Sequence, residues 1–142
     1  IVLGGVSIPF NKAFLAHSDG DVVIHSIIDA VLGAAAMGDI GVHFPDTNPQ
    51  YKNVDSRILL RETEKLIHLN YRVSNLDITV IAEAPKIKPY TLEMRDNFAS
   101  DLRMKVSDVN VKATTTEKMG YIGRGEGVAA KAVCLLRSVG LD

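Results

Sequence analysis

The sequence has very little cysteine and almost no net charge, and each shortage excludes a class of protein. Its 142 residues include a single cysteine, Cys134, so no disulfide can form within the chain and a reducing compartment is expected. Because no activating partner lies near it in sequence, we expect Cys134 to be buried and structural. The formal net charge of -1, from 16 basic and 17 acidic residues, argues against a general binder of nucleic acid or membrane surfaces.

Long apolar runs are missing as well. The longest uncharged stretches, residues 1–11 and 30–38, are far shorter than the roughly 20 residues of a membrane-spanning helix. No secretory signal or transit segment is recognisable. Hydrophobic residues make up 46% of the chain and charged residues 23%, which is ordinary for a soluble globular protein. We therefore expect one domain over residues 1–142 with a core of its own.

The hydrophobic pattern predicts an alternation of helices and strands. Gly4-Gly5 between two apolar runs indicates a hairpin or bent strand. Helical spacing predicts helices over 22–37, from 55 onward and over 91–102, whereas residues 39–52 are expected to form a loop. The residues of the second helix expected to face inward are Leu59, Leu60, Thr63, Leu66 and Ile67. Alternation predicts strands over 76–80 and 109–113, and 128–136 fits strand or helix. The order of elements predicts an α+β fold, a single mixed β-sheet with helices packed on one face.

The first group of candidate functional residues lies where the helix over 22–37 begins. Residues 17–21 are polar, and Asp21 or Asp19 can cap the helix. His25 lies on its first turns with Asp21 and Asp29 four residues to either side, so the three share a face. A metal-bound histidine usually has a carboxylate or carbonyl partner, which makes His25 a candidate ligand. The alternative is a capped helix with a satisfied histidine.

Three further segments carry polar groups suited to chemistry. In 38–48, Asp39 and Asp46 could grip hydroxyls of a polyol, although helix-stop and turn chemistry uses the same residues. Residues 112–118 offer three threonines, backbone N–H groups and lysines, which together could bind a phosphate group. The carboxylate of Glu117 could bind Mg²⁺. The alternative is an edge strand running into a capped helix. The glycine-rich stretch 120–127 lacks the P-loop spacing and indicates close backbone packing or a turn. No Ser-His-Asp or Cys-His arrangement stands out, so the nucleophile of an enzyme built on this chain would belong to its substrate.

Five stretches together resemble the 2-C-methyl-D-erythritol 2,4-cyclodiphosphate synthases of the non-mevalonate isoprenoid pathway. They are AHSDGDVVIH at 16–25, LGAAAMGDIGVHFPDTNP at 32–49, DSRILLRE at 55–62, ITVIAEAPKIKP at 78–89 and DVNVKATTTEKMGYIGRGEG at 108–127. The resemblance covers essentially the whole chain. It implies an α+β homotrimer with active sites between neighbouring subunits, and a phosphorus-oxygen lyase. In the implied reaction, the 2-phosphate of 4-diphosphocytidyl-2-C-methyl-D-erythritol 2-phosphate attacks the β-phosphorus, giving the cyclic diphosphate and CMP.

The resemblance also implies roles for individual residues. His25 matches a ligand of Zn²⁺ or another divalent transition metal, Glu117 matches the residue that meets Mg²⁺ or Mn²⁺, and His17 and Thr115 match positions that stabilise the transition state. The methylerythritol pocket is matched by His17, Ser18, Asp39, Ile40, Gly41, Phe44, Pro45, Asp46, Thr47 and Asn48. The grip on cytidine and phosphates is matched by Ala82, Glu83, Ala84, Pro85, Lys86, Ile87, Lys88, Thr114, Thr115, Thr116 and Glu117. Tyr121 and Arg124 match positions near the trimer axis, where some members bind an isoprenoid diphosphate.

One family feature has no match. The family's zinc site adds an Asp and a His from an N-terminal D-x-H strand, and no D-x-H precedes His25. We expect that segment to belong upstream of Ile1, so that this chain alone binds zinc weakly and only the full-length protein is active. Other interpretations are a non-catalytic trimeric binding protein for isoprenoid diphosphates, the cyclase half of a fused cytidylyltransferase–cyclase, and a phosphohydrolase. The expected compartment is the cytoplasm of a bacterium, or a plastid in a eukaryote.

Overall fold

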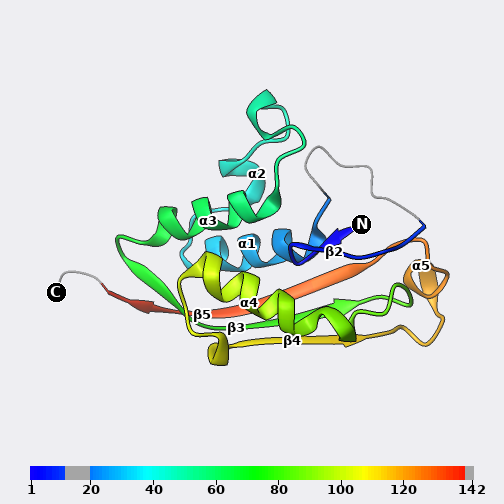
Figure 1. Ribbon diagram of the computed structural model, residues 1–142. Coiled ribbons are helices and arrows are strands. Elements are labelled where there is room, and N and C mark those ends of the chain that lie inside the picture. The colour runs from blue at the N-terminus through cyan, green and yellow to red at the C-terminus, as the bar shows by residue number, and fades with distance from the viewer. Residues whose placement is uncertain (12–19, 140–142) are drawn as a thin grey trace.

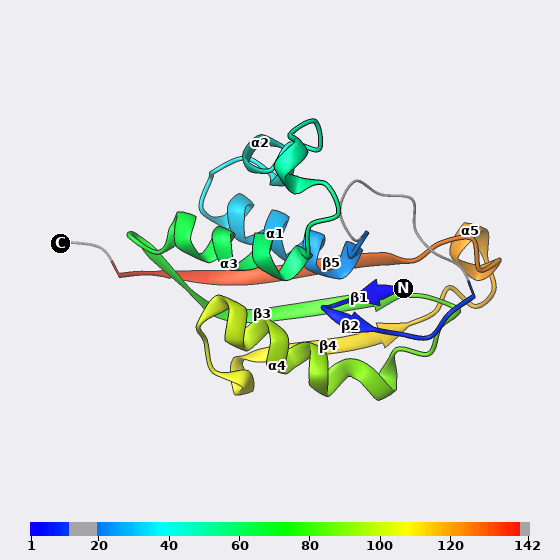
Figure 2. The same ribbon diagram turned by 45° about the horizontal axis from the view of Figure 1, so that its top comes forward.

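A three-stranded mixed sheet forms the base of the fold in the computed structural model, which describes residues 1–11 and 20–139 (Figure 1). The strands are β3 (Tyr71–Ile81), β4 (Val109–Thr114) and β5 (Ala129–Ser138), in the order β4-β3-β5 (Figure 2). β3 runs parallel to β4 and antiparallel to β5. The helices α1 (Val22–Ala34), α3 (Ser56–Ile67) and α4 (Thr91–Leu102) lie over one face of this sheet, which confirms the predicted α+β class.

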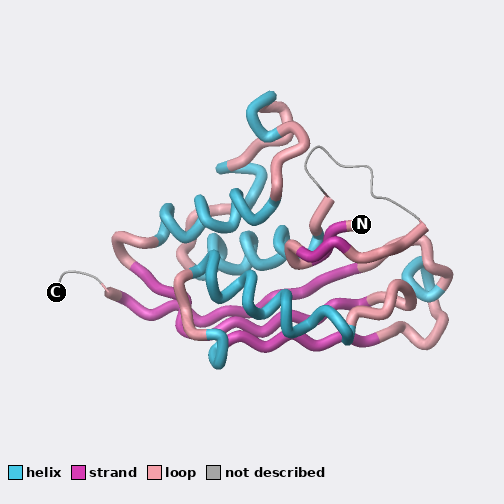
Figure 3. Tube along the Cα trace, in the orientation of Figure 1, coloured by secondary structure: helices cyan, strands magenta, loops and turns pink. Residues whose placement is uncertain are grey.

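The first residues form a separate two-stranded hairpin beside α1 (Figure 3). β1 (Val2–Leu3) pairs antiparallel with β2 (Val6–Ser7) around Gly4-Gly5, so the hairpin is confirmed but the expected single sheet is not. Both glycines have positive φ, and a Cβ on Gly4 would lie 2.6 Å from Cγ of Met94. Only a residue without a side chain fits this turn, which brings the chain against α4.

Most of the remaining elements are short. The segment predicted as a loop over 39–52 contains α2 (Ile40–His43) and the 3₁₀ turn η1 (Pro49–Tyr51). Two more 3₁₀ turns, η2 (Lys88–Tyr90) and η3 (Val106–Asp108), precede α4 and β4, and α5 (Gly120–Gly123) is a single turn. None of the described helices has the length and apolar character needed to cross a bilayer.

The core lies between the helices and the sheet. α1 buries Ile24, Ile27 and Val31 on one side, and Leu76, Ile78 and Val80 of β3 face them from the sheet. α3 buries four of its five predicted inward residues, but Leu66 is 40% exposed because it lies on the outer side of the helix. Cys134 on β5 is only half-buried, so the expected burial is found in part, and this burial raises the pKa of its thiol.

A buried carboxylate fastens α3 to α4. Asp101, whose side chain is 1% exposed, accepts hydrogen bonds from Nε and Nη2 of Arg57 at 2.8 and 3.0 Å and from Nη1 of Arg61 at 3.1 Å. The Asp101 hydrogen bond, followed by its charge, raises the pKa of Arg57. This bidentate Arg57–Asp101 salt bridge holds the first turn of α3 in place. Ser56, at the start of the same turn, reaches the candidate site.

Candidate functional site

Asp21 fixes the start of α1, as one of the two predicted caps. Its Oδ1 accepts hydrogen bonds from the backbone N–H of Ile24 at 3.0 Å and of Gly4 at 2.8 Å, and its Oδ2 accepts from Gly5 at 2.7 Å. The residue is fully buried. One carboxylate therefore ties the hairpin turn to the first turn of α1, and His25 follows directly, its N–H bonded to the Asp21 carbonyl at 3.0 Å.

His25 lies against α3. Its Nε2 is 2.9 Å from Oγ of Ser56, the first residue of that helix, whose N-cap is Asp55. The two aspartates expected on the histidine's face serve other groups: Asp21 caps α1, and Asp29 accepts the N–H of Ile40 at 2.8 Å. Ser56 is thus a hydrogen-bond partner of His25 that the sequence did not indicate.

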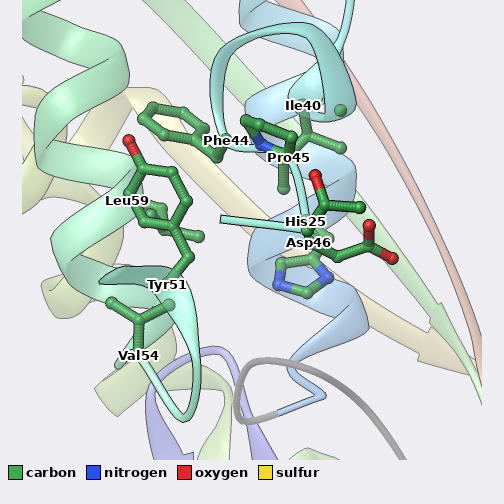
Figure 4. A pocket seen from close by; sticks show the side chains of 10 residues that line it. His25, Ile40, Phe44, Pro45, Asp46, Tyr51, Val54 and Leu59 are labelled. Atoms are coloured by element: carbon green, nitrogen blue, oxygen red, sulfur yellow. The ribbon is translucent and has the colours of Figure 1, made fainter. Parts of the chain in front are cut away.

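A pocket of about 520 Å³ opens beside His25 (Figure 4). Six residues predicted for the methylerythritol pocket line it, namely Ile40, Gly41, Phe44, Pro45, Asp46 and Thr47. Asp46 and Thr47 are exposed, whereas His25 is half-buried. The pocket therefore combines an apolar wall with a carboxylate, a hydroxyl and an imidazole, a composition that suits a small polyol carrying an apolar group.

Of the predicted pocket residues that the structure describes, two do not line this pocket, and three residues that line it were not predicted. Asp39 accepts the N–H of Val42 at 3.0 Å as the cap of α2, and Asn48 accepts the N–H of Gln50 at 3.1 Å as the cap of η1. Both thus perform the turn chemistry weighed as the alternative. The missed residues complete the apolar wall: Tyr51, Val54 and Leu59, with the Tyr51 ring edge-on to Phe44 at 5.6 Å. The sequence had predicted Leu59 only as an inward-facing residue of a helix.

The predicted cytidine and phosphate segments form a second, separate group. They follow β3 and β4, which are parallel and therefore end at the same edge of the sheet (Figure 2). The N–H of Ala82 donates to the carbonyl of Thr114 at 3.0 Å, and the N–H of Lys118 donates to Oε1 of Glu83 at 2.7 Å. These two bonds join the loop over 82–88 to the segment 114–118.

The loop over 82–88 and the segment 114–118, which we call the loop pair, combine a fixed backbone with exposed side chains. Pro85 and Ile87 are buried. Glu117 and Lys118 have positive φ of 54° and 65°, and Oγ1 of Thr115 accepts the N–H of Glu117 at 3.2 Å. The carboxylate of Glu117 and the hydroxyl of Thr115 lie at the surface. Hydroxyls, a carboxylate and lysines on a compact turn suit a phosphate chain with a bound cation.

The glycine-rich stretch shows the close backbone packing expected of it. A Cβ on Gly123 would lie 2.1 Å from the carbonyl carbon of Lys118. Tyr121 and Arg124 are exposed on and after α5. Nε and Nη2 of Arg124 donate to the carboxylate of Glu126 at 2.9 and 3.1 Å, and this hydrogen-bonded pairing raises the pKa of Arg124.

The structure thus brings the predicted residues together in two groups. His25 meets residues 40–47, and the loop over 82–88 meets 114–118, but no residue of the second group lines the pocket of the first. His17 and Ser18 lie outside the described residues. Within residues 1–11 and 20–139, no three His, Cys, Asp or Glu side chains gather closely enough to hold a metal ion.

Comparison with known proteins gives a match over nearly the whole chain. A model of the YgbB family matches residues 1–137. A Proteus mirabilis protein named 2-C-methyl-D-erythritol 2,4-cyclodiphosphate synthase is 59% identical over 137 residues, covering 96% of this chain and 86% of the relative. A Thioalkalivibrio sulfidiphilus protein of the same name is 60% identical over 139 residues, covering 97% and 87%.

Solved structures share the fold. A Plasmodium falciparum protein described as a CDP complex superposes with a TM-score of 0.85 at 40% identity, covering 97% of this chain and 83% of its own. The bifunctional IspDF of Campylobacter jejuni gives a TM-score of 0.92 at 43% identity. This chain covers 38% of that longer protein.

Proposed function

We propose, from the premise that this chain belongs to the YgbB family, that its pocket and its loop pair are the two halves of one active site. The activity is that of a 2-C-methyl-D-erythritol 2,4-cyclodiphosphate synthase, a lyase of isoprenoid synthesis. The observation that carries the division of roles is the lining of the pocket, where His25 meets six residues expected to bind the methylerythritol unit. The non-catalytic binding protein is not favoured, because the curated relatives are named as synthases.

The pocket beside His25 is the proposed site of the methylerythritol unit. The exposed carboxylate of Asp46 accepts hydrogen bonds from substrate hydroxyls. Phe44, Tyr51 and Leu59 offer the apolar surface that a methyl group needs. Asp39 and Asn48 hold the walls by capping α2 and η1. The unit is thus held at its hydroxyls and its methyl group, with its 2-phosphate directed out of the pocket toward the diphosphate.

The loop pair is the proposed site of the cytidine diphosphate. Backbone groups beside the buried Pro85 and Ile87 are fixed in place and suit the edge of a base. Thr114, Thr115 and Thr116 offer hydroxyls, and Lys86 and Lys88 offer charge, to the phosphates. The description of the Plasmodium falciparum relative as a CDP complex supports a ligand of this class.

The reaction needs no nucleophile from the protein. An oxygen of the 2-phosphate forms a bond to the β-phosphorus, the bond from that phosphorus to the oxygen bridging to the α-phosphate breaks, and CMP leaves with that oxygen. Negative charge opposes the approach of the two phosphates, so the protein's task is to hold them close and to place donors around them. We propose this role for Thr115, whose hydroxyl lies at the surface of the loop pair, and for His17.

Two cation sites belong to the proposal. The imidazole of His25 suits one zinc ligand, because a metal-bound histidine needs a hydrogen-bond partner on its other nitrogen and Ser56 Oγ stands 2.9 Å from Nε2. Glu117, an exposed carboxylate beside three threonines, suits Mg²⁺ or Mn²⁺. When bound, these cations supply charge that offsets the repulsion between the phosphates.

We propose a homotrimer in which one subunit's pocket meets its neighbour's loop pair. The separation of the two groups within one chain supports this. The sheet face opposite the helices also supports it, because Val133 and Leu135 there are 70% and 60% exposed. Near the axis, Arg124 is the proposed contact for an isoprenoid diphosphate, with Tyr121 beside it, and that ligand would replace Glu126 as partner of the guanidinium. We propose a bacterial cytoplasm as the compartment, because these curated relatives come from bacteria.

Product analysis of the full-length enzyme tests the proposal. With Zn²⁺ and Mg²⁺, the diphosphocytidyl substrate should give CMP and the cyclic diphosphate in equal amounts. Asp46→Asn should lower kcat/KM by about ten- to a hundredfold, the effect of one charged hydrogen bond. Asp96→Asn, a change on the exposed side of α4, is the control. A linear hydrolysis product in place of the cyclic one would instead support the phosphohydrolase.

A further inference from the structure

A second pocket, of about 590 Å³, lies at the opposite end of the sheet from the loop pair. Arg72 and Ser74 near the start of β3 and Arg137 near the end of β5 line it. The last turn of α4 and residues of the segment 103–108 that follows complete the lining. The loop pair follows the other end of β3, ten residues away along the strand, which is roughly 30 Å. The cyclase chemistry described above uses no group in this pocket.

The pocket carries a large excess of positive charge. Arg72, Arg103, Lys105 and Arg137 line it, against one carboxylate, that of Asp108. In the described part of the chain, neither Lys105 nor Arg137 makes an ion pair, and Arg103 approaches the carboxylate of Glu64 only to 3.7 Å. The charges of Lys105 and Arg137 are therefore not balanced by an ion pair among the described residues, whereas Arg103 pairs with Glu64.

Arg72 is held in place without being neutralised. Its Nη1 donates to the carbonyls of His68 and, at 2.8 Å, of Tyr71, and its Nη2 lies 2.9 Å from Nε2 of His68. Carbonyl oxygens accept the hydrogen bonds of a guanidinium but do not cancel its charge. His68 is itself held by Glu64, with Nδ1 2.8 Å from Oε2. The guanidinium at this end of β3 is thus fixed in place and remains positive.

The strand pairing adds a like-charge contact at the same place. Arg72 and Arg137 are direct cross-strand partners, an arrangement that is destabilising unless something lies between the charges. The β3–β5 register also shifts between Val73 and Asn75, next to Ser74. Such irregularities often occur where a strand turns a side chain toward a ligand. Two independent features of the sheet therefore coincide with the basic pocket.

We propose that this pocket binds a small organic phosphate. Forked guanidinium groups and the hydroxyls of Ser74 and Ser100 match the oxygens of a phosphate, which would also screen Arg72 from Arg137. The side chain of Met104 is half-buried at the same pocket and offers apolar surface to the organic part of the ligand. The volume lies in the range of small-molecule sites.

Calorimetric titration of the full-length enzyme with phenyl phosphate tests the proposal, and the pocket variants separate this site from the active site. We expect saturable binding that is tighter than that of inorganic phosphate, because the phenyl ring contacts Met104. Changing Lys105→Gln and Arg137→Gln together should weaken binding about tenfold or more. Lys65→Gln, on α3 and outside the pocket, should leave it unchanged, and Asp108→Asn should tighten it.

Three results would overturn the proposal. The first is that phenyl phosphate shows no saturable binding, and the second is that binding persists in the variant changed at Lys105 and Arg137. The third is that Arg124→Gln removes the binding, because the ligand would then bind near the trimer axis. Equal affinity for phenyl phosphate and inorganic phosphate would overturn the organic part. The variants' CMP release, measured in parallel, separates this proposal from the cyclase, because Lys105 and Arg137 have no role in the proposed cyclisation.

Discussion

Replacing Asp21 with alanine should destabilise the protein more than any other single change of an aspartate at the start of a helix. The carboxylate is fully buried and accepts three backbone N–H groups, those of Gly4, Gly5 and Ile24. Loss of a helix cap costs about 1 kcal/mol, and each further buried donor left without a partner costs about 1–3 kcal/mol. We therefore expect Asp21→Ala to lower the free energy of unfolding by about 3–7 kcal/mol, a large part of a typical domain's stability.

Urea denaturation followed by circular dichroism, at one fixed protein concentration, measures this effect. The control is Asp29→Ala, since Asp29 is exposed and accepts one N–H, that of Ile40. That change should cost about 1 kcal/mol or less. If Asp21→Ala lowers the free energy of unfolding no more than Asp29→Ala does, the carboxylate does not hold the hairpin to α1 and the account of how His25 is positioned fails.

Two further changes test the surroundings of the site and of the sheet. Ser56→Ala should weaken zinc binding by the full-length enzyme about tenfold or more, because His25 loses the hydrogen-bond partner of its Nε2. A competition titration with a chelator measures the zinc affinity. An unchanged affinity would exclude Ser56 as a positioning residue. Asp77→Asn should lower the free energy of unfolding by less than about 1 kcal/mol at pH 7, because the Asp77 side chain is partly exposed and exposed ion pairs stabilise little. Hydrogen bonds from Lys112 and then Asn110 lower the pKa of Asp77. A group with a lowered folded-state pKa stabilises the fold above its unfolded pKa and loses this effect as the pH falls through its folded pKa, so the difference from wild type should shrink in unfolding curves as the pH falls below about 4. A difference that does not shrink there would contradict the assignment.

Much of the fold could be predicted because its signals are local. Asp55 caps α3, and α4 spans Thr91–Leu102, as the cap residues and apolar spacing indicated. The apolar run over 128–136 could not be assigned, because its pattern fits strand or helix and only pairing with β3 decides. The start of β3 at Tyr71 was missed because Arg72, Ser74 and Asn75 break the alternation where the register shifts.

The site residues could be named from the sequence, but their grouping could not. The resemblance supplied Asp46 and Glu117, yet nothing in the spacing shows that one lies by the pocket and the other in a separate loop pair. The contact of His25 with Ser56 was missed for a similar reason. Carboxylates four residues away were the visible candidates, whereas Ser56 comes from a different helix, 31 residues along the chain.

Mixed trimers test most directly whether one cyclase site takes its two halves from neighbouring subunits. Full-length Asp46→Asn and Glu117→Gln subunits are co-expressed in equal amounts, and CMP release is measured for each pure variant and for the mixture. A site with its pocket from one subunit and its loop pair from the next is intact in about one quarter of random pairings, so the mixture should recover about a quarter of wild-type activity. A mixture no more active than the pure variants would contradict the account, because it would mean that both halves come from the same chain.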